Sequence, residues 1–280
     1  MRLLLAILVI FAASQEVLPE DQETDISFTA TFDQSEQRYV LWQPSEVSTL
    51  DGCGVLIALH GHGSDRWQFI QNPRDECRAV RDMARKHNMA IIAPDYRATT
   101  SWMGPAAESD MLQIVEEYRK QHKPDRVLLV GGSMGATSAL TFAALHPETI
   151  DGVVAMNGIA NHVEYTNFQE AITSSFGGDK QTKPEEYQKR SAEYRADILT
   201  MPVAFTIGGA DVMTPPQSII RLADNLKKLG RNVLLIQQPS GGHETNYEDA
   251  CEAIAYVIMQ TTSENDSNEK QDTTPVSPAE

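Results

Sequence analysis

The chain has 280 residues, of which 41% are hydrophobic, so it can form the core of one large α/β domain or of two small ones. Its formal net charge of −16 argues against nucleic acid and anionic membranes as partners, because binding to phosphate needs clustered lysine and arginine. We expect the acidity to keep the protein soluble.

The first residues have the pattern of a secretory signal peptide. Arg2 precedes an apolar stretch over residues 3–13, and the small residues Ala12 and Ser14 suit a cleavage site after Ser14. The apolar stretch is too short to span a bilayer. We therefore predict a signal peptide over residues 1–14, a mature protein that is secreted or periplasmic, and no stable membrane insertion after cleavage. An uncleaved anchor is the alternative.

A β-hairpin is predicted next, because residues 26–32 and 37–42 alternate apolar and polar side chains around a turn. Short apolar runs then alternate with helical patterns, which indicates a mostly parallel sheet with helices on both faces. The predicted strands are residues 55–59, 90–93, 127–130, 153–156, 203–207 and 233–236, and the predicted helices are residues 74–87, 106–122, 134–145, 216–229 and 246–259. With the hairpin this makes an α/β fold, a three-layer α/β/α sandwich around an eight-stranded sheet.

Two regions interrupt the alternation. Residues 158–200 make an unusually long connection between two strands, and a connection of this length within a compact domain is typical of a lid or cap insertion. Residues 261–280 contain almost nothing apolar and are predicted to form a disordered tail. The main domain is therefore expected over residues 15–260.

Three cysteines allow one disulfide and leave one thiol. None has the C-x-x-C spacing of metal or redox sites. Cys77 and Cys251 fall on apolar faces of predicted helices, so we expect buried thiols, with a Cys77–Cys251 bridge as the alternative.

Residues 131–135, Gly-Gly-Ser-Met-Gly, stand between a buried strand and a helical pattern and match the G-x-S-x-G motif of a serine nucleophile. A strand that turns into a helix within so few residues forces Ser133 into a strained backbone conformation. Side chains flanking the serine would collide with the neighbouring strand and helix, which explains the glycines. The turn is expected to lift the Ser133 hydroxyl above the sheet.

A serine nucleophile needs a general base, and the base needs an orienting carboxylate. His243 follows the strand predicted over residues 233–236, and Asp211 follows the strand over residues 203–207. Loops at the carboxyl ends of parallel strands gather at one edge of a sheet, where Ser133 also lies. We therefore predict a catalytic triad of Ser133, Asp211 and His243.

An oxyanion hole needs two backbone N–H donors directed at the oxygen that gains charge. The N–H group of Met134, directly after the nucleophile, supplies one. The glycine-rich loop over residues 60–64 follows a strand and is expected to supply the other, from His62 or, as an alternative, from Gly63.

Over roughly residues 27–260 the chain resembles the α/β-hydrolase superfamily, and within it the catalytic domains of prolyl-oligopeptidase-like and dienelactone-hydrolase-like enzymes. The stretches that carry the narrower resemblance are residues 187–192, 198–202, 209–211, 214–218 and 242–243. The resemblance implies the same roles for the triad: Ser133 as nucleophile, Asp211 as acid and His243 as base.

Three further residues are predicted to contact the substrate. Trp102 and Tyr96 lie in the loop after the fourth strand, where Trp102 could stack on a sugar or an aromatic acyl group, and His162 begins the insertion. The motifs of phosphate loops, dinucleotide-binding turns and zinc peptidases do not occur in the sequence, so we expect no cofactor and no metal.

The sequence thus predicts an exported serine esterase that acts on a small-molecule or polysaccharide-linked ester through an acyl-enzyme. Two other classes stay open. A small serine peptidase or amidase would use the same triad but would cleave peptide anilides, and a non-catalytic binding module would keep the fold without turnover.

Overall fold

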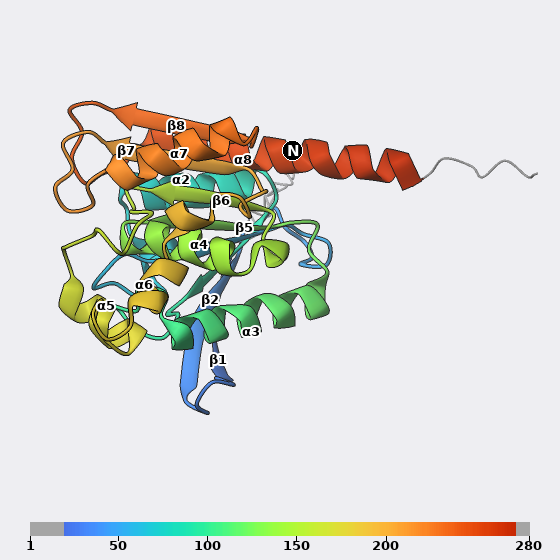
Figure 1. The fold of residues 1–280 in the computed structure, drawn as a ribbon. Helices are drawn as coiled ribbons and strands as arrows, with labels where there is room; N and C mark the ends of the chain where they lie inside the picture. The colour runs from blue at the N-terminus through green and yellow to red at the C-terminus, as the bar shows by residue number, and fades with distance from the viewer. Residues whose placement is uncertain (1–19, 273–280) are drawn as a thin grey trace, which may run out of the picture.

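The computed structural model describes residues 20–272, so the predicted signal peptide lies outside the described residues. Within this range one eight-stranded sheet runs in the order β1-β2-β4-β3-β5-β6-β7-β8 (Figure 1). The strands are β1 (Gln22–Thr29), β2 (Glu36–Gln43), β3 (Val55–Leu59), β4 (Ala90–Pro94), β5 (Val127–Gly132), β6 (Gly152–Met156), β7 (Val203–Gly208) and β8 (Val233–Gln238). β2 pairs antiparallel with β1 and β4, and every other pair is parallel, which confirms the predicted architecture.

Helices cover both faces of the sheet. They are α1 (Gln68–Gln71), α2 (Asp75–Lys86), α3 (Pro105–His122), α4 (Met134–Leu145), α5 (Gln169–Phe176), α6 (Pro184–Lys189), α7 (Gln217–Lys228) and α8 (Tyr247–Asp272), with short 3₁₀ turns η1 (Pro147–Thr149) and η2 (Ala192–Arg195). α3, α4 and α7 pack on one face, and α2 and α8 pack together on the other.

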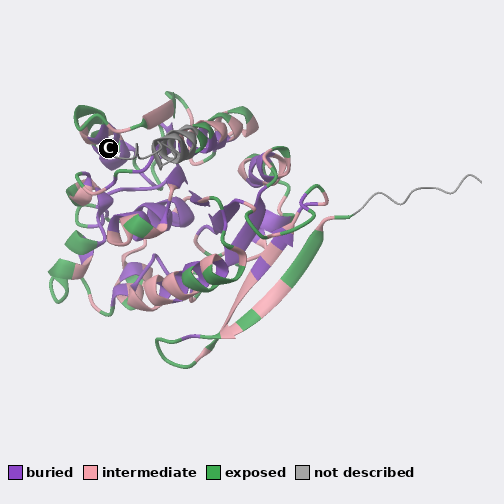
Figure 2. Cartoon of the chain, turned by 90° about the vertical axis from the view of Figure 1, so that its right-hand side faces the viewer, coloured by how far each residue is buried: buried purple, intermediate pink, exposed green. Residues whose placement is uncertain are grey.

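The two cores follow from the alternation of side chains along each buried strand. In β3, Val55, Ile57 and Leu59 point into the core under α3 and α4, whereas Leu56 and Ala58 point into the core under α2 and α8. The hairpin at the sheet edge is less buried, and β1 presents mainly exposed or half-buried residues (Figure 2).

The C-terminal region differs from the prediction. Residues 261–272, expected to be part of a disordered tail, continue α8 to Asp272, whereas residues 273–280 lie outside the described residues. No glycine or proline occurs between Tyr247 and Asp272, so the sequence contains no strong helix breaker there. Thr261 is buried, and its hydroxyl donates to the Val257 carbonyl within the helix.

Residues 158–200 connect β6 to β7 and contain α5, α6 and η2. Arg190, which is 1% exposed, anchors this connection to the start of α3: its guanidinium donates to the Met103 carbonyl at 2.8 Å and to Glu108 at 2.7 Å. Phe176 and Tyr187 pack in the core beneath it. Its role as a lid remains a prediction.

All three cysteines are free thiols, so the alternative of a Cys77–Cys251 bridge is wrong. Cys77 is buried on α2, and Cys251 is half-buried on α8. In the described part of the chain no helix is long and apolar enough to cross a bilayer.

The first turn of α4 lies very close to β3. A β-carbon added to Gly135 would lie 1.9 Å from the Leu59 carbonyl oxygen, and one added to Gly131 would lie 2.3 Å from the Gly135 carbonyl carbon. Contacts this short are sterically impossible, so both positions require glycine. A β-carbon on Gly132, by contrast, would meet only the Phe69 ring edge, at 3.9 Å.

We expect Gly135→Ala to destabilise the fold by about 3 kcal/mol, because α4 has to move away from β3 to admit the methyl group. Urea unfolding measures the change, and Gly132→Ala is the matched control, with an expected loss of less than about 0.5 kcal/mol. Equal stability of the two variants would contradict the steric explanation.

His162 is expected to make stability depend on pH. The residue is 1% exposed, and within residues 20–272 neither ring nitrogen has a hydrogen-bond partner. Burial lowers the pKa of His162 to about 3, and the charges of Arg190 and Lys180 act in the same direction. Between about pH 6.5 and about pH 3 the unfolded chain binds a proton at His162 that the folded protein does not, so stability falls as the pH falls through this window.

The His162→Phe variant should therefore lose less stability than the wild type when the pH is lowered from 7 to 5, by about 2 kcal/mol. Urea unfolding of each protein at pH 7 and pH 5 gives its loss of unfolding free energy between the two pH values. A change in packing caused by the substitution is the same at both pH values, so it does not contribute to this loss. Parallel losses in the two proteins would show that His162 does not titrate as described.

Candidate active site

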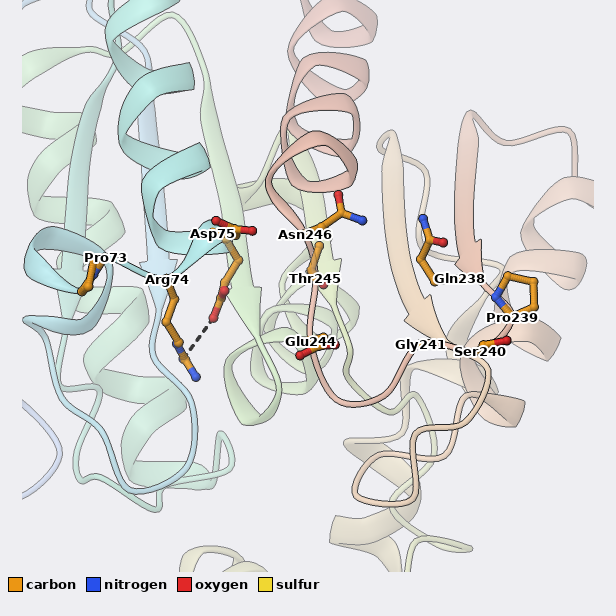
Figure 3. Close-up of a pocket in the computed structure, with 11 residues that line it drawn as sticks. Pro73, Arg74, Asp75, Gln238, Pro239, Ser240, Gly241, Glu244, Thr245 and Asn246 are labelled. Carbon is orange, nitrogen blue, oxygen red and sulfur yellow. Dashed lines mark ion pairs between the residues drawn. The ribbon is translucent and has the colours of Figure 1, made fainter.

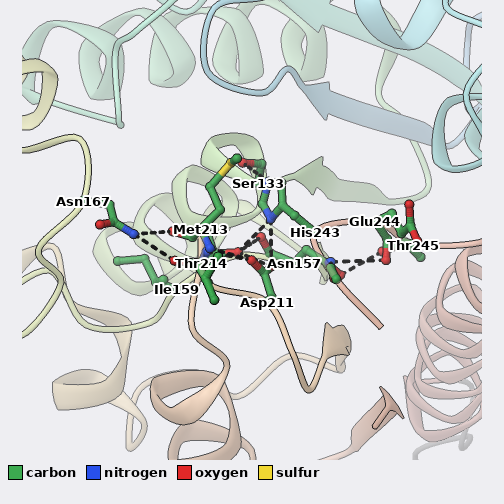
Figure 4. A network of polar contacts seen from close by, with 12 residues as sticks. Ser133, Asn157, Ile159, Asn167, Asp211, Met213, Thr214, His243, Glu244 and Thr245 are labelled. Atoms are coloured by element: carbon green, nitrogen blue, oxygen red, sulfur yellow. Dashed lines mark hydrogen bonds and ion pairs between the residues drawn. The ribbon is translucent and has the colours of Figure 1, made fainter. Parts of the chain in front are cut away.

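The structure brings the three predicted triad residues together at the carboxyl edge of the sheet (Figure 4). Ser133 follows β5, Asp211 follows β7 and His243 follows β8. The Ser133 hydroxyl lies 2.9 Å from His243 Nε2, and His243 Nδ1 lies 2.7 Å from Asp211 Oδ2. These are hydrogen-bond distances, and they link the three side chains in the order serine, histidine, aspartate that serine catalysis requires.

Asp211 is held ready to accept a hydrogen bond from the histidine. Its Oδ1 accepts from the N–H groups of Met213 and Thr214, at 2.8 and 3.0 Å. The Thr214 hydroxyl lies 2.7 Å from Oδ2. Burial alone would raise the pKa of Asp211, but the hydrogen bonds from His243 and Thr214 outweigh it and lower the pKa. The carboxylate therefore stays charged and can stabilise a protonated imidazole.

Asn157, directly after β6, fixes the loop that carries His243. Its side-chain amide donates to the carbonyl oxygens of Gly242 and Glu244, at 3.1 and 3.2 Å, on either side of the histidine. Its Oδ1 accepts from the Thr245 hydroxyl at 3.0 Å. Asn157 is 5% exposed and has a φ of 52°, a left-handed conformation that asparagine tolerates better than most residues.

Ser133, the predicted nucleophile, has the strained backbone that the sequence predicts. Ser133 has φ 57° and ψ −119°, and its N–H donates to the Met156 carbonyl at 2.8 Å. This conformation directs the hydroxyl toward His243 and starts α4 at the next residue, Met134.

The two predicted oxyanion donors lie in suitable backbone positions. Met134 is the first residue of α4, so its N–H has no carbonyl partner within the helix. In the loop after β3, Gly61 N–H donates to Gln68 and Gly63 N–H donates to Thr99. The N–H group of Gly63, the alternative donor, is therefore already hydrogen-bonded, whereas the His62 N–H has no partner among residues 20–272. A β-carbon on Gly61 would lie 3.8 Å from Ser133 Cβ, which shows how closely this loop approaches the nucleophile.

The three predicted substrate-contact residues lie inside the protein instead of on the surface of the site. Trp102, Tyr96 and His162 are 0%, 2% and 1% exposed. The Trp102 indole donates to His62 Nδ1 at 3.1 Å, and the Tyr96 hydroxyl donates to the His60 carbonyl at 2.6 Å. Trp102 and Tyr96 therefore both support the loop over residues 60–64, and His162 packs against Trp102 and Phe176. The expected stacking of Trp102 on a substrate is wrong for this structure.

A small cavity of about 40 Å³ lies over the nucleophile. Its lining includes Ser133, His243 and Gly61, together with Gln68 and Asn157, which the sequence analysis did not single out. A signal for Asn157 was present, since it is a polar residue at the carboxyl end of the buried strand β6. Gln68 gave no such signal, because it lies in the short helix α1, which was not predicted.

Among residues 20–272 no group of three or more histidine, cysteine, aspartate or glutamate side chains is arranged to hold a metal ion.

Comparison with solved structures shows the same fold in several hydrolases. An acylaminoacyl peptidase from Pyrococcus horikoshii matches with a TM-score of 0.65 and 16% identity over 88% of this chain and 42% of its own. An S-formylglutathione hydrolase from Agrobacterium tumefaciens matches with a TM-score of 0.66 and 15% identity over 89% of this chain and 98% of its own. A ferulic acid esterase matches with a TM-score of 0.65 and 15% identity over 86% of this chain and 99% of its own.

The chain thus spans less than half the length of the acylaminoacyl peptidase. At these identities the three matches establish the fold alone. A comparison of the sequence with well-characterised proteins gives no significant match.

The family assignment comes from the sequence. Residues 95–258, more than half of the chain, match the model of the prolyl oligopeptidase family, and this stretch includes all three triad residues. Together with the sheet order and the position of the triad, the match shows that the chain belongs to the prolyl oligopeptidase family of serine hydrolases and has the α/β-hydrolase fold.

Proposed function

We propose that the protein hydrolyses carboxylic esters through an acyl-enzyme on Ser133. The observation that carries the proposal is the hydrogen-bonded series from Ser133 through His243 to Asp211, with distances of 2.9 and 2.7 Å. A solvated serine hydroxyl is a weak nucleophile, and a base within hydrogen-bond distance is the usual means of activating it.

In the proposed reaction the Ser133 oxygen attacks the ester carbonyl while His243 Nε2 takes its proton. The carbonyl oxygen becomes an oxyanion and accepts hydrogen bonds from the N–H groups of Met134 and His62. His243 then gives the proton to the departing alcohol, and Asp211 stabilises the charged imidazole in between. A water molecule, activated by His243 in the same way, releases the acid and restores Ser133.

Two observations support an ester over a peptide substrate. The S-formylglutathione hydrolase and the ferulic acid esterase share the fold with this chain over nearly their whole lengths, whereas the match to the acylaminoacyl peptidase covers 42% of that protein. The small cavity over Ser133 also leaves little room for a bulky acyl residue such as a peptide side chain. Because the family match includes peptidases by name, cleavage of peptide anilides is the competing activity to measure.

We also propose that the mature protein is exported to the periplasm or the cell exterior. The leader pattern over residues 1–14 supports this, and the N-terminal residue of the mature protein is its test. The proposed substrate is a small-molecule or polysaccharide-linked ester.

Mixing the protein with p-nitrophenyl acetate should release a rapid burst of p-nitrophenol, close to one per chain when deacylation is slower than acylation. The burst should vanish in Ser133→Ala, which keeps the fold but lacks the nucleophile, and the steady-state rate should fall by at least about a thousandfold. Stopped-flow absorbance measures both quantities. Mass spectrometry of the quenched protein should show an acetyl group on Ser133, and an acetyl group elsewhere would contradict the assignment.

Asn157→Ala should lower kcat for p-nitrophenyl acetate by ten- to a hundredfold with a small change in KM, because the His243 loop loses both of its amide hydrogen bonds. Asn161→Ala is the matched control: this buried asparagine donates to Glu193 in the insertion and should leave kcat within about twofold. Urea unfolding of both variants separates positioning from stability. A loss of kcat that is equal in the two variants would contradict the positioning role of Asn157.

A further inference from the structure

A large groove lies next to the small cavity at Ser133. The cavity at Ser133 has a volume of about 40 Å³, whereas the groove has a volume of about 790 Å³ (Figure 3). The two are adjacent, since Arg74, Glu76, Glu244 and Thr245 line both of them. A substrate that reacts at Ser133 can therefore place a small part in the cavity and a large part in the groove.

The chemistry of the triad decides which part of the substrate lies in the groove. His243 has to deliver a proton to the leaving oxygen, so the alcohol departs on the side of the histidine. One wall of the groove is the segment that carries His243, with Gln238, Ser240 and Asn246 among its residues, and the other wall is the start of α2 (Figure 3). Neither His62 nor Met134, the proposed oxyanion donors, lines it. His243 itself lines the cavity, whereas Gly241 and Glu244, which precede and follow it, line the groove. The groove thus lies beside the histidine that protonates the leaving alcohol.

The charges along the groove are unevenly compensated. Arg74 pairs with Glu76 at 3.0 Å, and Asp75 pairs with Arg78 at 3.0 Å. Glu244, directly after His243, is exposed and has no cation within ion-pair distance among the described residues. One negative charge therefore remains at the junction of the cavity and the groove.

The lining also excludes another mode of recognition. None of the eleven residues that line the groove is aromatic, so it offers no ring on which a sugar or a planar group could stack. Without aromatic stacking, the main basis for selecting a ligand in the groove is electrostatic attraction. The formal net charge of −16 on the chain also attracts cations.

We propose that this groove binds the leaving alcohol of the substrate and that Glu244 makes it prefer alcohols with a positive charge. The inference rests on the proposed ester hydrolysis and adds a substrate class to it: esters of a small acyl group with a large, cationic alcohol. Glu244 acts on specificity and takes no part in bond making or breaking.

Two acetate esters of the same shape test the proposal. Acetylcholine carries a quaternary ammonium group, and 3,3-dimethylbutyl acetate has a neutral carbon in its place. The wild type should have the higher kcat/KM for acetylcholine, and Glu244→Gln should reduce the ratio of the two kcat/KM values by about three- to fivefold at low ionic strength. The ratio should also decrease as salt is added. Because it compares two substrates of one enzyme, any general effect on His243 cancels.

Glu248→Gln is the matched control, since Glu248 is exposed on the first turn of α8 and does not line the groove. It should leave the ratio unchanged. An equal ratio in the wild type and Glu244→Gln would overturn the proposal, as would a normal burst with p-nitrophenyl acetate and no turnover of either ester.

Binding of the two free alcohols keeps this test separate from that of the proposed function. Choline and 3,3-dimethylbutan-1-ol are titrated into the wild type, Ser133→Ala and Glu244→Gln and followed by nuclear magnetic resonance. Tighter binding of choline that survives Ser133→Ala and is lost in Glu244→Gln supports the groove even if no ester is hydrolysed. Equal binding of the two alcohols in the wild type overturns it.

Discussion

The contact between the first turn of α4 and the end of β3 sets the geometry of the whole site. Gly135 lies so close to the Leu59 carbonyl that no side chain fits between them. This approach holds α4 against the sheet, and Ser133 has to take a left-handed backbone conformation to connect β5 to it. The same strand, β3, leads directly into the loop of His62. One steric constraint therefore places both Ser133, the proposed nucleophile, and the two backbone donors of the proposed oxyanion hole.

The base and the carboxylate depend on a different kind of interaction. They lie in loops, and loops are held in place by specific hydrogen bonds more than by apolar packing. Asn157 holds the segment on either side of His243, and Thr214 holds Asp211. Asn157 itself follows β6, the strand between those that precede Ser133 and Asp211. The middle strand of the site thus leads into the residue whose side-chain amide holds the His243 loop, two strands away.

The sequence predicted those parts of the structure that depend on local patterns. Runs such as residues 127–130 are apolar because both faces of a central strand are buried, and the glycines around Ser133 reflect contacts within a few residues. Parallel strands then bring Asp211 and His243 to the edge where Ser133 lies. The positions of Trp102 and His162 were not predictable in this way. An aromatic residue in a loop can line a pocket or fill a core, and only the packing of the connection between β6 and β7 decides which. The length of α8 was missed because polar composition was taken as evidence of disorder, although the segment contains no helix breaker.

The packing of α2 against α8 has an evolutionary consequence for the groove. The two walls of the groove are the start of α2 and the segment that leads into α8. Their separation is therefore set by the apolar core between these helices, to which Val80 and Ile254 belong. The distance between packed helices varies with the size of the residues at their contact. Substitutions deep in this apolar seam can therefore widen or narrow the groove without altering any residue that faces a ligand. Related chains can diverge in the alcohols they accept while the residues around Ser133 stay the same.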